Sequence, residues 1–137
     1  MVHCYTAVGV GRGNETNSGN GSSLYAIIGS AARLLDRNIT VVGRVVQGID
    51  LLSPMKRGTG PLGFYEKAEE RTPIREVKLA SELPPEKRMP LEALRTDSKT
   101  FATLVQMRRF RKDDWYKVPA GHVDVCNVPL PVRVKKD

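Results

Sequence analysis

Apolar residues gather in two short runs in the first third of the chain. Residues 24–28 form the first run, Leu-Tyr-Ala-Ile-Ile, between pairs of small residues. Residues 39–46 form the second run, which is rich in β-branched side chains. Runs of this length and composition predict strands. The Asp-Arg-Asn sequence at 36–38 predicts a turn between them, because short polar side chains bond their own backbone there.

Two further elements flank these runs. Ile49, Leu51 and Leu52 predict a short helix after the second run, and the Ser-Pro pair at 53–54 ends it, because a residue before proline avoids the helical region. Residues 1–13 carry apolar side chains among small ones and form an earlier strand candidate.

At these positions the order of residues resembles that of a known family. Residues 21–27 read Gly-Ser-Ser-Leu-Tyr-Ala-Ile, and residues 34–50 read Leu-Leu-Asp-Arg-Asn-Ile-Thr-Val-Val-Gly-Arg-Val-Val-Gln-Gly-Ile-Asp. Together they resemble the second half of a cyclophilin, a peptidyl-prolyl cis-trans isomerase that acts in protein folding. That family carries a Gly-Ser-Gln-Phe-Phe-Ile strand, and a Leu-Asp-Gly-x-x-x-Val-Phe-Gly-x-Val-x-x-Gly segment follows at this distance. The match is ungapped from Ser23 to Gly48 and is similar to a divergent bacterial branch with a C-terminal extension.

The resemblance implies a mainly β fold, a partial cyclophilin-like antiparallel barrel with a short helix, followed by an α-containing C-terminal extension. Residues 1–80 would be the C-terminal half of a cyclophilin-like domain, and residues 81–137 an extension with one or two helices. The family's barrel is closed, and a half-barrel has open edges that template aggregation. We therefore expect the chain to be the C-terminal part of a longer protein, read from an internal Met, with the missing N-terminal half of the barrel as a partner.

The resemblance also implies a groove for a proline-containing polypeptide. Residues 11–13 align with the strand whose backbone pairs with the bound peptide, and glycine lets another backbone approach there. Taken without the resemblance, they would be an ordinary glycine-rich strand end. Leu24, Ala26 and Ile39 replace a Gln, a Phe and a His of the family, which makes the pocket more apolar and more open. By alignment the groove is lined by Gly11, Arg12, Gly13, Leu24, Ala26, Leu35 and Ile39.

The family's catalytic Arg has no counterpart in this sequence. Rotation about an X-Pro bond crosses a barrier of roughly 18–20 kcal/mol, and a positioned hydrogen-bond donor lowers it by reducing amide conjugation. The family supplies that donor from a His-Arg-x-Ile-x-x-Phe-x-x-Gln-x-Gly motif, which does not occur here. The catalytic residues therefore stay unassigned, and no cofactor is expected. We expect weak binding of X-Pro peptides or no activity; the alternative is a non-catalytic proline-peptide or protein-interaction module.

The later chain predicts a loop, a strand and a tail. Residues 57–70 contain three glycines and a proline and predict a loop. Residues 74–79 alternate apolar and polar side chains, which predicts a half-buried strand and matches the closing strand of a cyclophilin barrel. The resemblance ends near Ala80.

Two helices are expected in the tail. Pro90 suits the first turn of a short helix over residues 90–94. Asp97 suits the N-cap of a helix over residues 98–112, which has an apolar stripe. Three later prolines predict an extended or surface-hugging end.

The chain is basic, with 22 Lys and Arg against 15 Asp and Glu. Four cations, Arg108, Arg109, Arg111 and Lys112, lie near three aromatic residues, Phe110, Trp115 and Tyr116. This combination suits nucleic acid, through phosphate pairing and base stacking. The competing interpretation is that cations favour a helix C-terminus while the aromatic residues pack inward. We favour the second, so nucleic acid ranks as the last of three functional hypotheses.

Three interpretations compete for the cysteines and histidines. His3, Cys4, His122 and Cys126 could bind zinc, although adjacent side chains point to opposite faces of an extended segment, and we predict no metal site. A Cys4–Cys126 disulfide would staple the tail to the first strand in an oxidising compartment. Buried free thiols fit a cytosolic chain equally well.

Neither a membrane span nor a signal peptide is indicated. The sequence contains no apolar run of about 18 residues, so we expect no membrane partner. Residues 1–20 lack a basic segment followed by an apolar one; full-length relatives are expected to be periplasmic.

Overall fold

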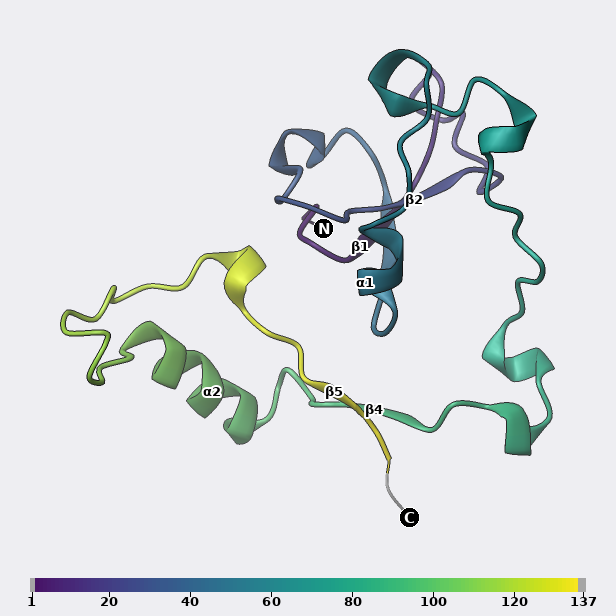
Figure 1. Ribbon diagram of the computed structural model, residues 1–137. Coiled ribbons are helices and arrows are strands. Elements are labelled where there is room, and N and C mark those ends of the chain that lie inside the picture. Colours follow the sequence, from purple (N-terminus) through teal and green to yellow (C-terminus); the bar gives the residue numbers. More distant parts are fainter. Residues whose placement is uncertain (1, 136–137) are drawn as a thin grey trace.

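The structure of the protein, a computed structural model, describes residues 2–135 (Figure 1). Its strands and α-helices, in chain order, are β1 (Ala7–Val10), β2 (Leu24–Ala26), β3 (Val41–Arg44), α1 (Ile49–Leu52), β4 (Leu91–Ala93), α2 (Lys99–Arg109) and β5 (Val132–Val134). Single-turn 3-10 helices occur between them. The predictions made for residues 1, 136 and 137 lie outside the described residues.

The N-terminal part is built on a three-stranded antiparallel sheet. β1 lies in the middle and pairs with β2 on one side and β3 on the other. Val8 faces Ala26 of β2 and Gly43 of β3, and the β1–β3 register shifts after Val8. The three predicted strands are confirmed, each shorter than its apolar run. The predicted turn at 36–38 and the helix beginning at Ile49 are also confirmed.

The hydrophobic core of this sheet is small. Ala7 and Val41 are its buried apolar side chains among the described residues, and the polar side chain of His3 is fully buried. The accessible surface is 11636 Å². A compact monomer of 15.2 kDa exposes only about 7,100 Å². The chain therefore leaves uncovered a large surface that a closed domain would bury.

The C-terminal part consists of a two-stranded ribbon and one helix. β4 and β5 pair antiparallel, with Glu92 opposite Arg133. The helix predicted over residues 90–94 is therefore wrong. The main-chain oxygen of Pro90 accepts from Lys135 and the Leu94 N–H donates to Pro131, so pairing with a distant strand overrides the local helix signal.

The second tail helix is confirmed, with different ends. Its N-cap is Ser98, whose Oγ accepts from the Phe101 N–H at 3.1 Å. The predicted cap, Asp97, instead forms an ion pair with Arg95 at 2.6 Å. The helix ends at Arg109, three residues before the predicted end. It is the longest helix in the described part of the chain, and with 11 residues it is too short to cross a membrane.

The strand predicted over residues 74–79 is not formed. Residues 72–78 make no main-chain hydrogen bond within residues 2–135, and Ile74 and Val77 are 81% and 83% exposed. Figure 1 shows this teal segment running apart from both sheets. A strand requires a neighbouring strand, and the described chain offers this segment none.

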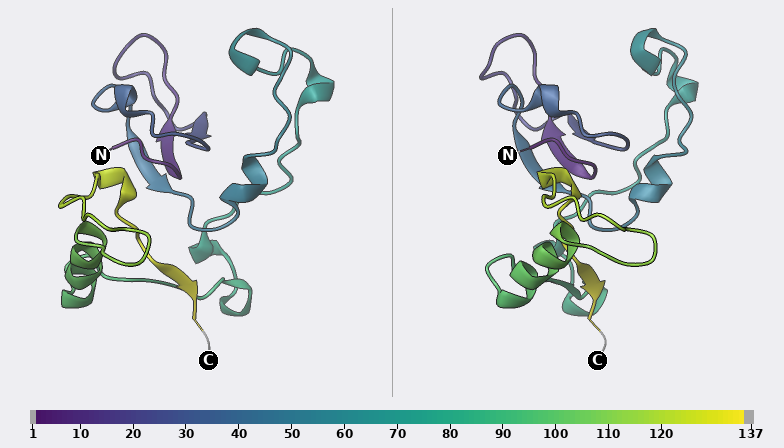
Figure 2. Two further views of the ribbon diagram at one scale, coloured as in Figure 1. Left: turned by 60° about the vertical axis from the view of Figure 1, so that its left-hand side comes forward. Right: turned by 90° about the vertical axis from the view of Figure 1, so that its left-hand side faces the viewer.

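Figure 2 shows where the tail meets the N-terminal part of the chain. In both views the yellow segment around the 3-10 helix Val125–Asn127 lies beside the N-terminal strands. The disulfide Cys4–Cys126 joins them there, with the two Cα atoms 5.0 Å apart.

Candidate functional site

The residues after β1 lie between the start of β2 and the segment that leads into β3. The Gly11 N–H donates to the Ser23 carbonyl at 2.8 Å, and the Val10 N–H donates to the Thr40 carbonyl at 3.0 Å. Val10 also faces Leu24 in the β1–β2 ladder. Segments far apart in sequence therefore meet at this end of the sheet.

The side chain of Arg12 is hydrogen-bonded within the chain, whereas its main-chain groups are free within the described residues. Its Nε donates to the Asn38 carbonyl at 3.0 Å, and its Nη1 donates to the carbonyls of Gly13 and Asn14 at 2.8 and 3.1 Å. Within residues 2–135 its main-chain N–H and C=O make no hydrogen bond. Backbone groups of this kind bind water or an added extended chain. The guanidinium holds the loop, and the peptide group is available for a ligand.

The two predicted close-approach glycines are used by the chain itself. A Cβ at Gly11 would lie 2.9 Å from Ser23 Oγ and 3.5 Å from the Ser23 carbonyl oxygen, so the residue that comes close is Ser23, which precedes β2. The Gly13 N–H donates to Ser18 Oγ at 2.9 Å. The glycines shape the loop around Arg12, and this function accounts for them without a ligand.

A pocket of about 280 Å³ adjoins this loop. Its walls include Val10, Arg12, Asn38 and Thr40. Arg12 is the one predicted groove residue that lines it. Leu24 is 61% exposed, and Ala26 lies at the far end of β2.

Leu35 and Ile39 meet in the turn before β3, where the Ile39 N–H donates to the Leu35 carbonyl at 3.2 Å. Both side chains are half-buried. The structure thus gathers Gly11, Arg12 and Leu24 at one end of the sheet. Ile39 lies close to them, because the carbonyl of its neighbour Thr40 accepts a hydrogen bond from the Val10 N–H. That all seven residues line one groove stays a prediction.

A buried hydrogen-bonded group lies next to this region and was missed by sequence reasoning. His3 is fully buried. Its Nδ1 lies 3.0 Å from Asp36 Oδ1, and its Nε2 lies 2.8 Å from the Tyr25 hydroxyl. The His3 main-chain N–H also donates to Asp36 at 2.7 Å. Gly9 faces Tyr25 in the ladder and leaves room for its ring. This pairing comes from the strand register, so no pattern in the sequence reveals the contact.

The charge of Asp36 fixes the proton positions in this group. An ion pair with Arg33 and the His3 N–H lower the pKa of Asp36 from 3.8 to about 2. Because the carboxylate is ionised, Nδ1 of His3 carries a proton and donates to it. In the neutral imidazole, Nε2 then accepts from the Tyr25 hydroxyl. Burial raises the pKa of Tyr25 above 10.0. The group ties residue 3 to β2 and to the turn before β3.

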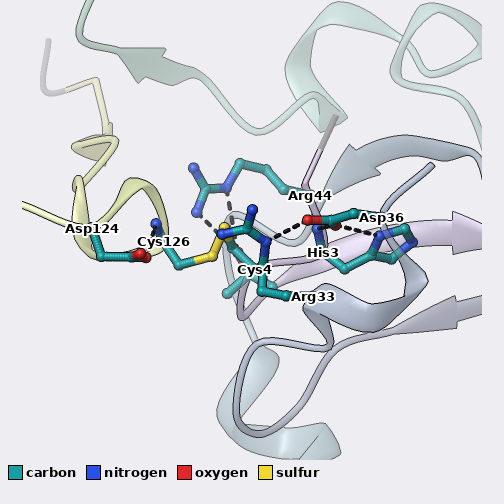
Figure 3. Close-up of a disulfide and its surroundings, with 8 residues drawn as sticks. His3, Cys4, Arg33, Asp36, Arg44, Asp124 and Cys126 are labelled. Atoms are coloured by element: carbon teal, nitrogen blue, oxygen red, sulfur yellow. Dashed lines mark hydrogen bonds and ion pairs between the residues drawn. A yellow bond between two sulfur atoms is a disulfide. The ribbon is translucent and has the colours of Figure 1, made fainter.

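The cysteines form a disulfide, so the free-thiol interpretation is wrong (Figure 3). The zinc interpretation is also unsupported, because no cluster of three His, Cys, Asp or Glu within residues 2–135 could hold a metal ion. Both sulfur-bearing residues are only partly exposed.

The basic cluster of the tail bears out only part of the favoured interpretation: Arg108 and Arg109 do lie in the last turn of α2. Trp115 is 84% exposed and Phe110 is 56% exposed, so the expected inward packing is wrong. Arg109 Nε donates to the Gly121 carbonyl at 2.8 Å. Arg111 pairs with Asp113 and lies 4.0 Å from the Tyr116 ring centroid. Part of the cation cluster is thus engaged within the tail.

The fold is similar to that of cyclophilin AquaCyp293 from Hirschia baltica. The TM-score is 0.62 with 24% sequence identity, over 100% of this chain and 45% of that one. No protein-family model matches the chain, and no curated protein matches it. The chain spans 45% of the length of that cyclophilin. The predicted fold class, mainly β and partially cyclophilin-like, is confirmed.

Proposed function

We propose that this chain carries the substrate groove of a cyclophilin-type peptidyl-prolyl cis-trans isomerase and binds proline-containing polypeptides at the end of β1. One observation carries the proposal: within residues 2–135, the main-chain N–H and C=O of Arg12 have no hydrogen-bond partner, two residues after β1, where the resemblance expects a peptide. The cyclophilin-like fold supports it.

The proposed binding mode pairs the ligand backbone with the Arg12 peptide group. Main-chain pairing supplies affinity, and neighbouring pockets select side chains. Leu24, Leu35 and Ile39 provide apolar surface for a proline ring. The groove would be lined by Gly11, Arg12, Gly13, Leu24, Ala26, Leu35 and Ile39.

Catalysis, in this proposal, depends on a donor from outside the chain. Two nitrogens of Arg12 already donate to backbone carbonyls, and Arg33 pairs with Asp36. A donor that weakens amide conjugation must be positioned at the X-Pro bond that rotates, in a site from which water is excluded. We infer that the chain alone binds the X-Pro peptide without accelerating its rotation.

We further propose that a polypeptide supplying the other strands of the barrel is the partner. The exposed surface exceeds that of a compact monomer by roughly 4,500 Å², and a standard interface buries only about 1,600 Å² in total. β2 and β3 each have an outer edge without a neighbour in the described chain. Residues 72–78 also lack main-chain partners. These three features suit a partner that adds strands to the open edges of β2 and β3 and pairs with residues 72–78.

Peptide titration into isotopically labelled protein tests the groove. We expect an X-Pro tetrapeptide to shift the amide signals of Arg12 and Leu24 and to leave that of Arg133, in β5, unchanged. The change Leu24→Gln restores the amide side chain of the family and should tighten binding. Leu51→Gln, at another exposed leucine, is the matched control and should change nothing. Shifts spread evenly over both sheets would refute the groove.

Hydrogen exchange tests the partner. Adding a polypeptide that contains the first half of a cyclophilin barrel should slow amide exchange in residues 72–78 as a ladder forms. The β4 and β5 amides serve as internal controls, since that ladder is already complete. A complex in which residues 72–78 exchange as fast as before would contradict this partner.

The first alternative is a non-catalytic proline-peptide or protein-interaction module. The Arg12 guanidinium favours it, because its nitrogens already donate to backbone carbonyls. The second alternative, a nucleic-acid binder, rests on the cations 108–112 and the exposed Trp115. Its signature is a steep loss of binding with salt. Absence of binding to single-stranded nucleic acid at low salt would eliminate it.

A further inference from the structure

The described chain consists of two units that are each held together locally. The first unit, residues 2–52, contains the three-stranded sheet and the His3 group. The second unit, residues 91–135, contains the β4–β5 ribbon and α2. Among residues 2–135, no hydrogen bond or ion pair connects these two units. The Cys4–Cys126 disulfide is their direct link.

The connecting segment, residues 53–90, does not hold the units against each other. Its side-chain hydrogen bonds are local; the longest in sequence joins Thr59 to Glu70. Tyr65 donates to the Lys56 carbonyl, and Arg88 donates to the carbonyls of Leu83 and Ser81. Cleavage of the disulfide would leave the units joined by a long, locally folded connection.

The contact around the disulfide is apolar and open. A pocket of about 420 Å³ is lined on one side by Val2, Ala7 and Val41. On the other side it is lined by Val125, Cys126 and Val128, from the second unit. Ala7 and Val41 are the two buried apolar side chains of the sheet. The second unit therefore helps to cover the small core of the first, through a few side chains.

Charged side chains lie near the disulfide, among them Arg33, Arg44 and Asp124. Arg44 lines the same pocket as both cysteines and donates to Thr6 Oγ1 at 3.0 Å. Figure 3 shows it with the disulfide and with Arg33, whose pKa is raised chiefly by Asp36 and also by Asp124 near Cys126. A guanidinium nearby stabilises a thiolate, which is the leaving group when a disulfide is reduced. Both cysteines are also partly exposed, so a reductant has access.

We propose that the Cys4–Cys126 disulfide is a redox latch that holds the C-terminal unit over the sheet and releases it on reduction. The reductant is a dithiol. Its thiolate attacks one sulfur, the S–S bond breaks, and the other cysteine leaves as a thiolate that takes up a proton. The second thiol of the reductant resolves the mixed disulfide. The protein gains two electrons and two protons as two thiols, and the dithiol becomes a disulfide.

Release has a defined structural consequence. Val125 and Val128 leave the pocket, and the apolar surface of Ala7 and Val41 becomes accessible. The sheet persists, because its ladders and the His3 group do not involve the second unit. The latch concerns the arrangement of the two units and holds whether or not the chain binds proline peptides.

Methyl NMR on the full chain tests the latch. In the oxidised protein we expect nuclear Overhauser contacts between the methyl groups of Val41 and those of Val125 or Val128. A dithiol without denaturant should abolish these contacts and leave the β1–β3 contacts intact, and reoxidation should restore them. The double variant Cys4→Ser, Cys126→Ser should show the released state with or without the dithiol.

Three outcomes would overturn the latch. Contacts that persist after both thiols are shown to be free would mean that the apolar packing holds the units unaided. A disulfide that resists the dithiol in the folded protein would be structural. Loss of the β1–β3 contacts together with the disulfide would mean that the bond supports the sheet itself. A double variant that fails to fold leaves the reduction and reoxidation of the unmodified chain to decide.

Discussion

Replacing Gly9 by alanine tests whether the His3 group stabilises the sheet. Gly9 lies in β1 opposite Tyr25. A Cβ there would overlap the Oη and Cζ atoms of Tyr25 and would lie 2.8 Å from its Cε1. The ring has to move, and its hydroxyl then leaves His3 Nε2, to which it is bonded at 2.8 Å.

The cost follows from two contributions. Overpacking of this kind costs about 1–3 kcal/mol. The loss of one internal hydrogen bond adds about 0.5–1.5 kcal/mol. We therefore expect Gly9→Ala to lower the free energy of unfolding by about 2–4 kcal/mol, a large share of the stability of a small domain.

The assay is urea unfolding followed by the near-ultraviolet signal of the tyrosines, with hydrogen exchange of the β1 amides as a second readout. Gly43→Ala is the matched control. It lies in the neighbouring strand β3, and a Cβ there would meet no atom within 4 Å. It should leave stability unchanged or raise it by about 0.4–1 kcal/mol, since alanine restricts the unfolded chain.

A double variant separates the steric cause from a general glycine effect. In a Tyr25→Val background the ring is absent, so Gly9→Ala should cost little. A cost in that background as large as in the unmodified chain would refute the reasoning. Equal effects of Gly9→Ala and Gly43→Ala would refute it as well.

Three further predictions concern charge, capping and a loop. Asp36 has a folded pKa of about 2, below its ordinary 3.8, so its stabilisation is present above about pH 4 and is lost as pH falls through 2; urea unfolding should show the difference between the unmodified chain and Asp36→Asn shrinking over that window. Ser98→Ala should destabilise α2 by about 1 kcal/mol, visible as faster amide exchange in its first turn, while Asp97→Ala should have a smaller effect there. Gly58→Ala should disrupt the loop, because its Cβ would overlap the Phe64 carbonyl; faster exchange of the residue 58 amide, which now donates to the Gly63 carbonyl, is the expected result, and unchanged exchange would contradict it.

The sequence predicts elements whose signals are local. The runs at 24–28 and 39–46 become β2 and β3, because composition and the flanking turn residues specify them within a few positions. Residues 90–94 carry a local helix signal, yet they pair with β5, some forty positions away. Residues 74–79 carry a strand pattern with nothing in the described chain to pair with. Long-range pairing decides both cases, and one sequence does not reveal it.

The same limit applies to the site. The resemblance orders the groove residues along the chain, and the proximity of Gly11 to the start of β2 follows from strand pairing. The hydrogen bonds from the Arg12 guanidinium to backbone carbonyls depend on the path of a ten-residue polar loop. The His3 group joins residues 22 and 33 positions apart, and no spacing pattern announces it. The sequence allows a zinc site, a disulfide or free thiols for the cysteines. Only the distance between Cys4 and Cys126 in the folded chain decides among them.

The most direct test of the proposed function measures binding and rotation in one experiment. An X-Pro peptide is observed by NMR exchange spectroscopy at low temperature with the purified chain present. Uncatalysed rotation takes tens of seconds or longer, so any acceleration is easily seen. Our account predicts shifted signals at Arg12 with no acceleration of cis/trans exchange. Acceleration by the chain alone would contradict the inferred need for an outside donor, and a peptide that leaves the Arg12 signals unmoved would contradict the groove itself.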